Sequence, residues 1–193
     1  MALSLFPVSA LGSQETSVYQ SSGGLPKLTR GEITQLLEDS SLSLPASLFE
    51  TDPSLTAPYA PGKVTHEALQ AALDRLNLMR RLAGLPGVTL DTSLNENAQY
   101  GALLLAVSSF SHSPAQPGDM DSSTYQNGLS AVSSSNIHYG SGGIYSNLVY
   151  SVDSYMDDSD AGIISRIGHR RWQLNPCLVK VGFGLVKKGS AAF

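Results

Sequence analysis

Two histidines in polar segments, His112 and His169, are the residues of this chain best suited to chemistry. His169 belongs to a run that also holds two arginines and the only tryptophan, residues 168–176, directly before a Gly-containing segment typical of a strand. His112 follows a predicted helix, and Pro114 favours an extended backbone there. An imidazole in such a position can act as a general base, as a metal ligand or as a structural hydrogen-bonding group.

Neighbouring nucleophiles give little support for covalent catalysis. Ser111 and Ser113 flank His112, but residues adjacent in sequence seldom form a base–nucleophile pair, and no Gly-x-Ser-x-Gly elbow is present. Cys177, the only cysteine, begins the predicted strand and is interpreted as a small buried residue. Phosphate-binding and dinucleotide-binding glycine motifs are also absent.

A metal site would need several ligands to converge, commonly imidazoles and carboxylates. His112 and His169 lie 57 residues apart, and no local spacing such as His-Glu-x-x-His connects them. Only the fold can therefore bring them together. The possible carboxylate partners are Asp119, Asp121, Asp153, Asp157, Asp158 and Asp160.

Composition indicates one ordinary domain with an additional segment. The chain has 193 residues, of which 41% are hydrophobic and 15% charged, and its net charge is −4 with no basic block. These values give no electrostatic support for nucleic-acid binding. No apolar run approaches the roughly 20 residues of a membrane-spanning helix, and the first residues do not form a signal peptide. A single cysteine excludes a disulfide scaffold.

Residues 1–24, rich in Ser, Gly and Gln, are predicted to form a disordered or peripheral arm. Residues 25–63 are predicted to hold a short helix, begun by the capping box of Thr29 and Glu32, and then a Pro-rich strap. Residues 64–193 are predicted to form the main domain.

Within that domain the 3.6-residue apolar period predicts a helix capped by Thr65 and ended by Gly84. A second helix should open at Ser93, where Glu96 completes a capping box, and a third should span about 145–157. Residues 108–143 are predicted to be a polar loop, and 178–186 a strand. A sheet ending at that strand would have an unprotected edge, so we expect a truncated chain or a sheet completed from outside.

In chain order, six short motifs resemble those of the CAP superfamily (cysteine-rich secretory proteins, antigen 5 and pathogenesis-related proteins), in its bacterial SCP-like branch. They span roughly residues 65–186. The motifs are the first helix around 73–86, the second helix at 90–99, Phe110-Ser111-His112-Ser113, Ser134-Ser135-Asn136-Ile137, Val152-Asp153-Ser154-Tyr155-Met156, and Gly168-His169-Arg170 with Leu174-Asn175-Pro176 and Val181-Gly182-Phe183-Gly184.

The resemblance implies an α+β fold, an α-β-α sandwich of CAP type with a central antiparallel sheet and a large cleft. It carries over His112 and His169 as the two cleft histidines. The second acidic position is best matched by Asp158, with Asp157 as a register alternative, and Ser135 stands where the family has glutamate. No particular cofactor is predicted. Because one carboxylate of the family's set is missing, we expect at most weak zinc binding, at His112, His169 and Asp158.

The same resemblance implies a secreted or surface-attached bacterial protein, extracellular or at the cell surface and not transmembrane. We expect a ligand-binding module rather than an enzyme, with a cleft lined by His112, Ser135, Asn136, Asp158 and His169. Its partner would be a small molecule, a lipid, a peptide or an envelope glycan, and not nucleic acid. The alternatives are a hydrolase or peptidase that uses His112 or His169 as general base, and an adhesion domain with a vestigial cleft.

The residues after His169 are interpreted as structural. Arg170 and Arg171 should bind Asp157, Asp158 or Asp160, and Trp172 should enter the core.

Overall fold

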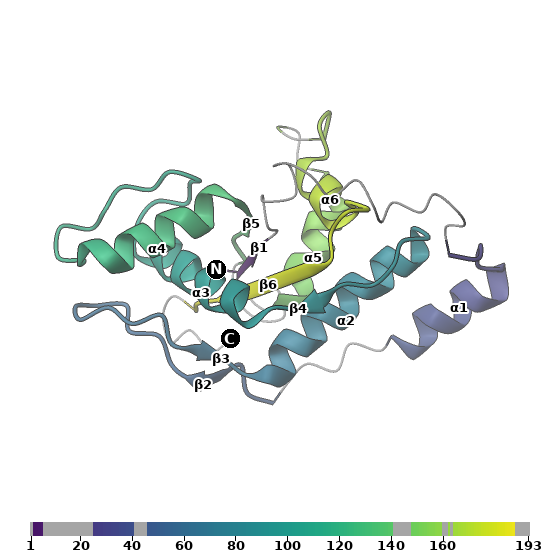
Figure 1. Cartoon of the computed structure of the whole chain (residues 1–193), viewed down its shortest axis with the longest axis horizontal. Coiled ribbons are helices and arrows are strands. Elements are labelled where there is room, and N and C mark those ends of the chain that lie inside the picture. Colours follow the sequence, from purple (N-terminus) through teal and green to yellow (C-terminus); the bar gives the residue numbers. More distant parts are fainter. Residues whose placement is uncertain are drawn as a thin grey trace, which may run out of the picture.

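The computed structural model describes residues 2–5, 25–40, 46–140, 148–159, 162 and 164–187. Strands and helices alternate irregularly along the chain (Figure 1). In order they are β1 (Ala2–Leu5), α1 (Arg30–Asp39), β2 (Phe49–Thr51), β3 (Lys63–Val64), α2 (His66–Leu82), β4 (Thr89–Leu90), α3 (Thr92–Val107), α4 (Ser122–Ser133), β5 (Ser135–His138), α5 (Leu148–Asp157), α6 (Gly168–Gln173) and β6 (Lys180–Leu185).

A four-stranded sheet, ordered β4-β6-β1-β5, forms the centre of the molecule. Strand β1 is antiparallel to both of its neighbours, whereas the short β4 is parallel to β6. The predicted α+β class is therefore confirmed. The antiparallel sheet is confirmed for β6, β1 and β5, with β4 as a parallel addition at one edge.

Along β6, large apolar side chains alternate with glycines. The two faces of this strand therefore meet different helices. Val181, Phe183 and Leu185 are buried on the side of α2 and α5. Gly182 and Gly184 face α3, where an added Cβ would stand 2.2 Å from the Leu94 carbonyl carbon and 2.3 Å from that of Ala98. The glycines thus let the backbone of α3 lie directly on β6, and period-2 alternation places helices against both faces of this strand.

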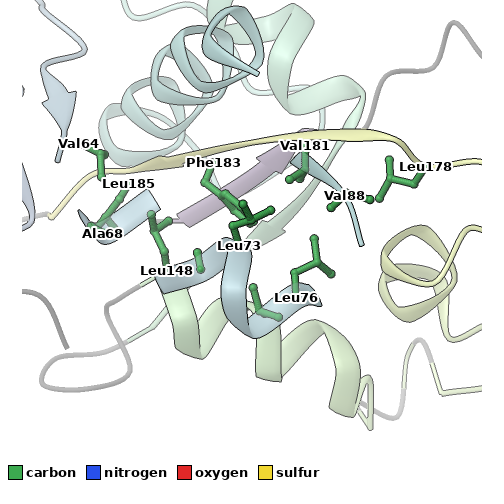
Figure 2. Packing of buried hydrophobic residues seen from close by; sticks show 12 residues of the cluster. Val64, Ala68, Leu73, Leu76, Val88, Leu148, Leu178, Val181, Phe183 and Leu185 are labelled. Carbon is green, nitrogen blue, oxygen red and sulfur yellow. The ribbon is translucent and has the colours of Figure 1, made fainter. Parts of the chain in front are cut away.

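The larger core lies between β6 and the helices α2 and α5 (Figure 2). Phe183 points from β6 toward Leu73 of α2, and Leu148 contributes from α5. In Figure 1 the yellow strand β6 crosses the centre, with α2 below it and α5 passing behind it. This core explains the stripe that the sequence showed at residues 69–76, because the apolar face of α2 is the face that meets the sheet.

Amide side chains of α3 complete the free part of the β6 edge. Beyond the two residues paired with β4, the backbone N–H of Phe183 donates to Asn95 Oδ1 at 2.9 Å. Gln99 accepts from the Leu185 N–H at 2.9 Å and donates to the Leu185 carbonyl at 2.7 Å. Among the described residues no strand pairs with this part of β6, and the two amide side chains supply the hydrogen bonds that such a strand would give.

The predicted N-terminal caps of two helices are confirmed. Thr29 and Glu32 form the capping box of α1, and Thr65 caps α2, whose chain turns at Gly84 with φ +73°. The start of α3 was predicted wrongly. Its cap is Asp91, whose carboxylate accepts from the Leu94 N–H; a hydrogen bond from Lys180 and this backbone bond lower the pKa of Asp91.

Helix α4 falls in the segment predicted as a polar loop. Its N-cap, Asp121, accepts from the Ser123 hydroxyl and the Thr124 N–H, which lower the pKa of that carboxyl to about 2. Gly128 lies so close to α3 that a Cβ would stand 2.8 Å from Leu104 Cβ. The helix has few large apolar residues, so it presents no period to detect, and contact with α3 decides its formation.

The N-terminal prediction is wrong for residues 2–5. They form β1, the strand between β5 and β6, rather than a disordered or peripheral arm. Residues 6–24 lie outside the described part of the chain. Because β1 and β4 flank β6, that strand is not the unprotected edge that the sequence suggested. The division at residues 24 and 63 remains a prediction.

The structure also bears on membrane insertion. Among the described residues no helix is long and apolar enough to cross a bilayer.

Candidate functional site

A buried carboxylate and an imidazole form the centre of the candidate site. Asp158 follows the last residue of α5, is only 2% exposed, and accepts from His169 Nδ1 at 2.8 Å. Its second oxygen accepts from the Arg170 backbone N–H at 3.2 Å. The Asp158 oxygen accepts this hydrogen bond, so the donor proton lies on His169 Nδ1, and Nε2 is then the acceptor nitrogen of the neutral ring. Asp157 is exposed, so Asp158 is the acidic residue beside His169.

The backbone is strained at Asp158 itself and at Ile167, two residues before His169. Asp158 has φ 46°, and Ile167, the residue before α6, has φ 41°. A left-handed conformation is uncommon for any residue except glycine and is unfavourable for a β-branched one. Such conformations persist only where surrounding contacts enforce them, and they concentrate at functional sites.

Strand β5 is joined to His169 by Asn136. The Asn136 amide is 3% exposed and its Nδ2 donates to the His169 carbonyl at 3.1 Å. The structure thus brings together three of the predicted cleft residues, Asn136, Asp158 and His169, from β5, the end of α5 and α6.

The ring of Tyr155 lies near the imidazoles of both His169 and His138. The Tyr155 ring centroid lies 5.3 Å from that of His169 and 6.0 Å from that of His138. Tyr155 is 2% exposed, and burial raises the pKa of its hydroxyl. The apolar period of α5 predicted that Tyr155 or Met156 is buried, but contact between Tyr155 and the two histidines has no signal in the sequence.

His112 is fixed at a different point of the same region. It follows α3 and is exposed, and its Nδ1 lies 2.6 Å from the carbonyl of Val132 in the last turn of α4. A carbonyl only accepts, so Nδ1 carries the proton. Val132 is four residues before Asn136, so both histidines are attached to the α4–β5 segment. None of the hydrogen bonds among the described residues joins the two imidazoles, and their meeting across one cleft remains a prediction.

Ser135 is buried and hydrogen-bonded, whereas Cys177 is exposed. The Ser135 hydroxyl is buried and donates to the Ala131 carbonyl of the preceding helical turn. Cys177 was predicted to be buried, and this is wrong: it is exposed, in a turn where its N–H donates to Asn175 Oδ1 at 2.9 Å. The strand begins only at Lys180, so Cys177 precedes the element that would have buried it.

The donor set does not fit a zinc site of the usual kind. Asp158 accepts from His169 Nδ1, an arrangement in which a carboxylate orients an imidazole rather than adding a ligand, and zinc sites use at least three protein ligands. In the part of the chain that the structure describes, no group of three or more His, Cys, Asp or Glu side chains is placed to hold a metal ion.

We therefore expect zinc to bind weakly. Isothermal titration calorimetry of the full chain should give no sub-micromolar binding, because the described residues bring fewer than three candidate ligands together. The double variant His112→Ala/His169→Ala serves as the control. Sub-micromolar binding that is lost in the double variant would contradict this expectation.

Segment 168–176 begins with the short helix α6, which the sequence analysis did not predict. Arg170 bonds backbone rather than carboxylates, donating from Nε to the Met156 carbonyl at 2.6 Å and from Nη2 to the Asp157 carbonyl at 2.5 Å. Trp172 is 40% exposed and therefore does not enter the core as predicted. The six-residue helix turns residues 171 and 172 outward, toward solvent, and Gln173 inward.

A cavity of about 590 Å³ lies beside α6. Its described lining includes Arg171, Trp172 and Pro176, but none of the five predicted cleft residues. Gly168 and Arg170, on either side of His169, belong to the lining, but Asp158 and His169 do not, and the predicted cleft around that pair remains a prediction.

A residue that the sequence did not single out as functional, Arg80 of α2, holds α6 in place. It is fully buried, and its guanidinium donates to four backbone carbonyls. The acceptors are Pro86 at 2.9 Å, Gln173 at 2.7 Å, Asn175 at 3.0 Å and Leu178 at 3.4 Å. Desolvation lowers the pKa of Arg80. The only sequence signal is that an arginine occupies the apolar stripe of α2.

Comparison with known proteins agrees with this architecture. The model of the family described as CAP, the cysteine-rich secretory protein family, matches residues 73–193. No curated protein and no solved structure gives a significant match. The matched range covers more than half of the chain and includes α3, the sheet strands β4, β5 and β6, and both histidines of the candidate site. This chain belongs to the CAP family.

Proposed function

We propose that this CAP-domain protein is a ligand-binding module whose recognition group is His169. The observation that carries the proposal is the Asp158–His169 hydrogen bond, in which a carboxylate side chain with no exposure orients an imidazole that is 25% exposed. A ring whose Nδ1–H is held by Asp158 presents Nε2 as an acceptor in one direction, which favours recognition of a hydroxyl or an amide N–H. His112, Ser135 and Asn136 complete the proposed cleft.

The proposed setting is extracellular, either secreted or attached to a bacterial surface. The family is often extracellular, which supports the proposal, and its ligand would then be an envelope lipid, a glycan or a peptide. One cysteine makes an intrachain disulfide impossible, so stability outside the cell would depend on the packed core.

Binding measurements test the recognition group. A fluorescent long-chain fatty acid, phosphatidylglycerol vesicles, a soluble peptidoglycan fragment and a random peptide pool would be offered to the full chain. We expect His169→Ala and Asp158→Asn to weaken the probe that binds by about 10-fold or more, the loss that accompanies removal of a charge-assisted hydrogen bond.

Matched controls separate this effect from general damage. His66→Ala removes an exposed imidazole at the start of α2, and Asp157→Asn changes the exposed neighbour of Asp158. Both should bind as the parent does. The proposal fails if none of the four probes binds, or if His169→Ala binds as tightly as His66→Ala.

A hydrolase is the alternative, because an Asp–His pair is also the orienting half of a catalytic triad. The described residues supply no hydroxyl or thiol hydrogen-bonded to His169 Nε2, so a water molecule would have to be the nucleophile. Turnover of peptide or ester substrates that vanishes in both His112→Ala and His169→Ala would favour this alternative over the binding module.

A further inference from the structure

Strand β1 pairs with both of its neighbouring strands across long sequence distances. Its four residues lie between β5 and β6, with Ser4 opposite Asn136 on one side and Phe183 on the other. Two antiparallel ladders therefore meet on one short segment. We call the position between β5 and β6 the slot. In the structure, residues 2–5 of the same chain occupy it.

The slot cannot remain empty without cost to the sheet. The strands that border it are buried: Asn136 and Ile137 on β5 are 3% and 9% exposed, and Phe183 and Leu185 on β6 are 1% and 0% exposed. Without β1, the N–H and C=O groups on two facing strand edges would lose their partners inside the protein. Any extended segment that restores those bonds is therefore favoured.

Chain length allows the segment to reach beyond its own domain. Residues 6–24 connect β1 to Leu25. At about 3.3 Å per residue a chain of that length spans up to roughly 60 Å. That reach exceeds the diameter of a domain of this size, about 30–40 Å from its expected radius of gyration.

We propose that the slot between β5 and β6 also accepts β1 of a second copy of this chain, and that reciprocal exchange gives a two-fold dimer. Each sheet keeps the order β4-β6-β1-β5, but its β1 belongs to the partner. Exchange of identical elements creates no new contact that a monomer lacks, so the balance depends on concentration.

The exchange would involve the candidate site. β1 pairs with Ser135 and Asn136, and Asn136 donates to the His169 carbonyl. In the exchanged dimer the strand that fixes Asn136 comes from the partner copy. The inference does not depend on what the site binds.

Single-cysteine variants test the exchange in a Cys177→Ser background. One protein carries Ser4→Cys and the other Asn136→Cys. Directly opposed antiparallel residues have Cα atoms about 4.5–5.5 Å apart, within the range of a disulfide. The two proteins are mixed, unfolded, refolded together at about 1 mM, which is comparable to the effective concentration of a tethered segment, and oxidised.

We expect a disulfide-linked heterodimer on a non-reducing gel. The control replaces Asn136→Cys with Ser130→Cys, an exposed position on α4 that does not pair with β1, and should give no excess of heterodimer. The double variant Ser4→Cys/Asn136→Cys should close an intramolecular disulfide when refolded dilute. If circular dichroism shows that Asn136→Cys does not fold, Leu5→Cys with the conservative Ser135→Cys replaces the pair.

Two results would overturn the proposal. If the dilute double variant closes its disulfide but the mixture yields no more heterodimer than the Ser130→Cys control, β1 fills the slot only within its own chain. If the double variant does not close, β1 does not occupy the slot at all. Neither result affects the test of His169 as a recognition group.

Discussion

Replacing Arg80 with methionine is expected to lower the free energy of unfolding by about 3–5 kcal/mol, the range found when a buried charged partner is removed. Four carbonyls lose their donor, and each buried acceptor left unpaired costs about 1–3 kcal/mol before relaxation or water entry reduces the sum. Urea unfolding followed by circular dichroism gives the difference, provided that the slope is unchanged. Domains of this kind are stable by only about 5–15 kcal/mol, so this variant is near the limit of folding.

Arg81→Met is the matched control, because it makes the same substitution at the next position of α2. Arg81 donates to the Pro26 carbonyl at 3.2 Å in an exposed contact. Its loss should cost less than about 1 kcal/mol. Arg80→Lys should fall between the two, because a single ammonium cannot reach acceptors arranged around a planar fork. Equal stability of Arg80→Met and Arg81→Met would show that the buried guanidinium does not hold α6.

Adding one methyl group at Gly184 is expected to destabilise the protein by about 3 kcal/mol or more, at the upper end of the cost of overpacking a core. The new Cβ would stand 2.3 Å from the carbonyl carbon and oxygen of Ala98 and 2.5 Å from the Gln99 nitrogen. These atoms belong to the backbone of α3 and cannot rotate away. The helix must move off the sheet, and Gln99 would then lose its bonds to Leu185.

Gly118→Ala is the control for this prediction, because a Cβ at Gly118 meets nothing within 4 Å. Its unfolding free energy should remain within about 0.5 kcal/mol of the parent, as is usual for an exposed substitution. Thermal unfolding monitored by near-ultraviolet circular dichroism compares the two variants. If Gly184→Ala melts at the temperature of Gly118→Ala, α3 does not lie against β6 as the structure describes.

The two predictions concern the supports of the candidate site rather than the site itself. Arg80 holds the carbonyls of Gln173 and Asn175, just after His169, and Gly184 lets α3 lie on the strand that borders β1. Both residues act through the position of α6 or of the sheet. Their effects should therefore appear first as loss of stability and only then as loss of ligand binding.

Local patterns predicted the elements whose signals are short in range. The caps of α1 and α2 and the apolar face of α2 depend on residues three or four positions apart, which the sequence displays directly. Helix α4 was not predicted because its Ser, Gly and Ala residues form no apolar period. The N-cap of α3 was assigned to Ser93 instead of Asp91 because both side chains offer an acceptor oxygen.

The sequence by itself determined the family motifs, the helical faces, and the glycine alternation in β6 that fixes which layer each side chain meets. Only the tertiary structure decided that Asp158 rather than Asp157 holds His169, that Arg80 is enclosed by carbonyls, and that residues 2–5 are a central strand. The physical reason is distance along the chain. Periodicity records contacts within a few residues, whereas these contacts join segments from 11 to 183 residues apart, and their partners are largely backbone atoms that every residue possesses.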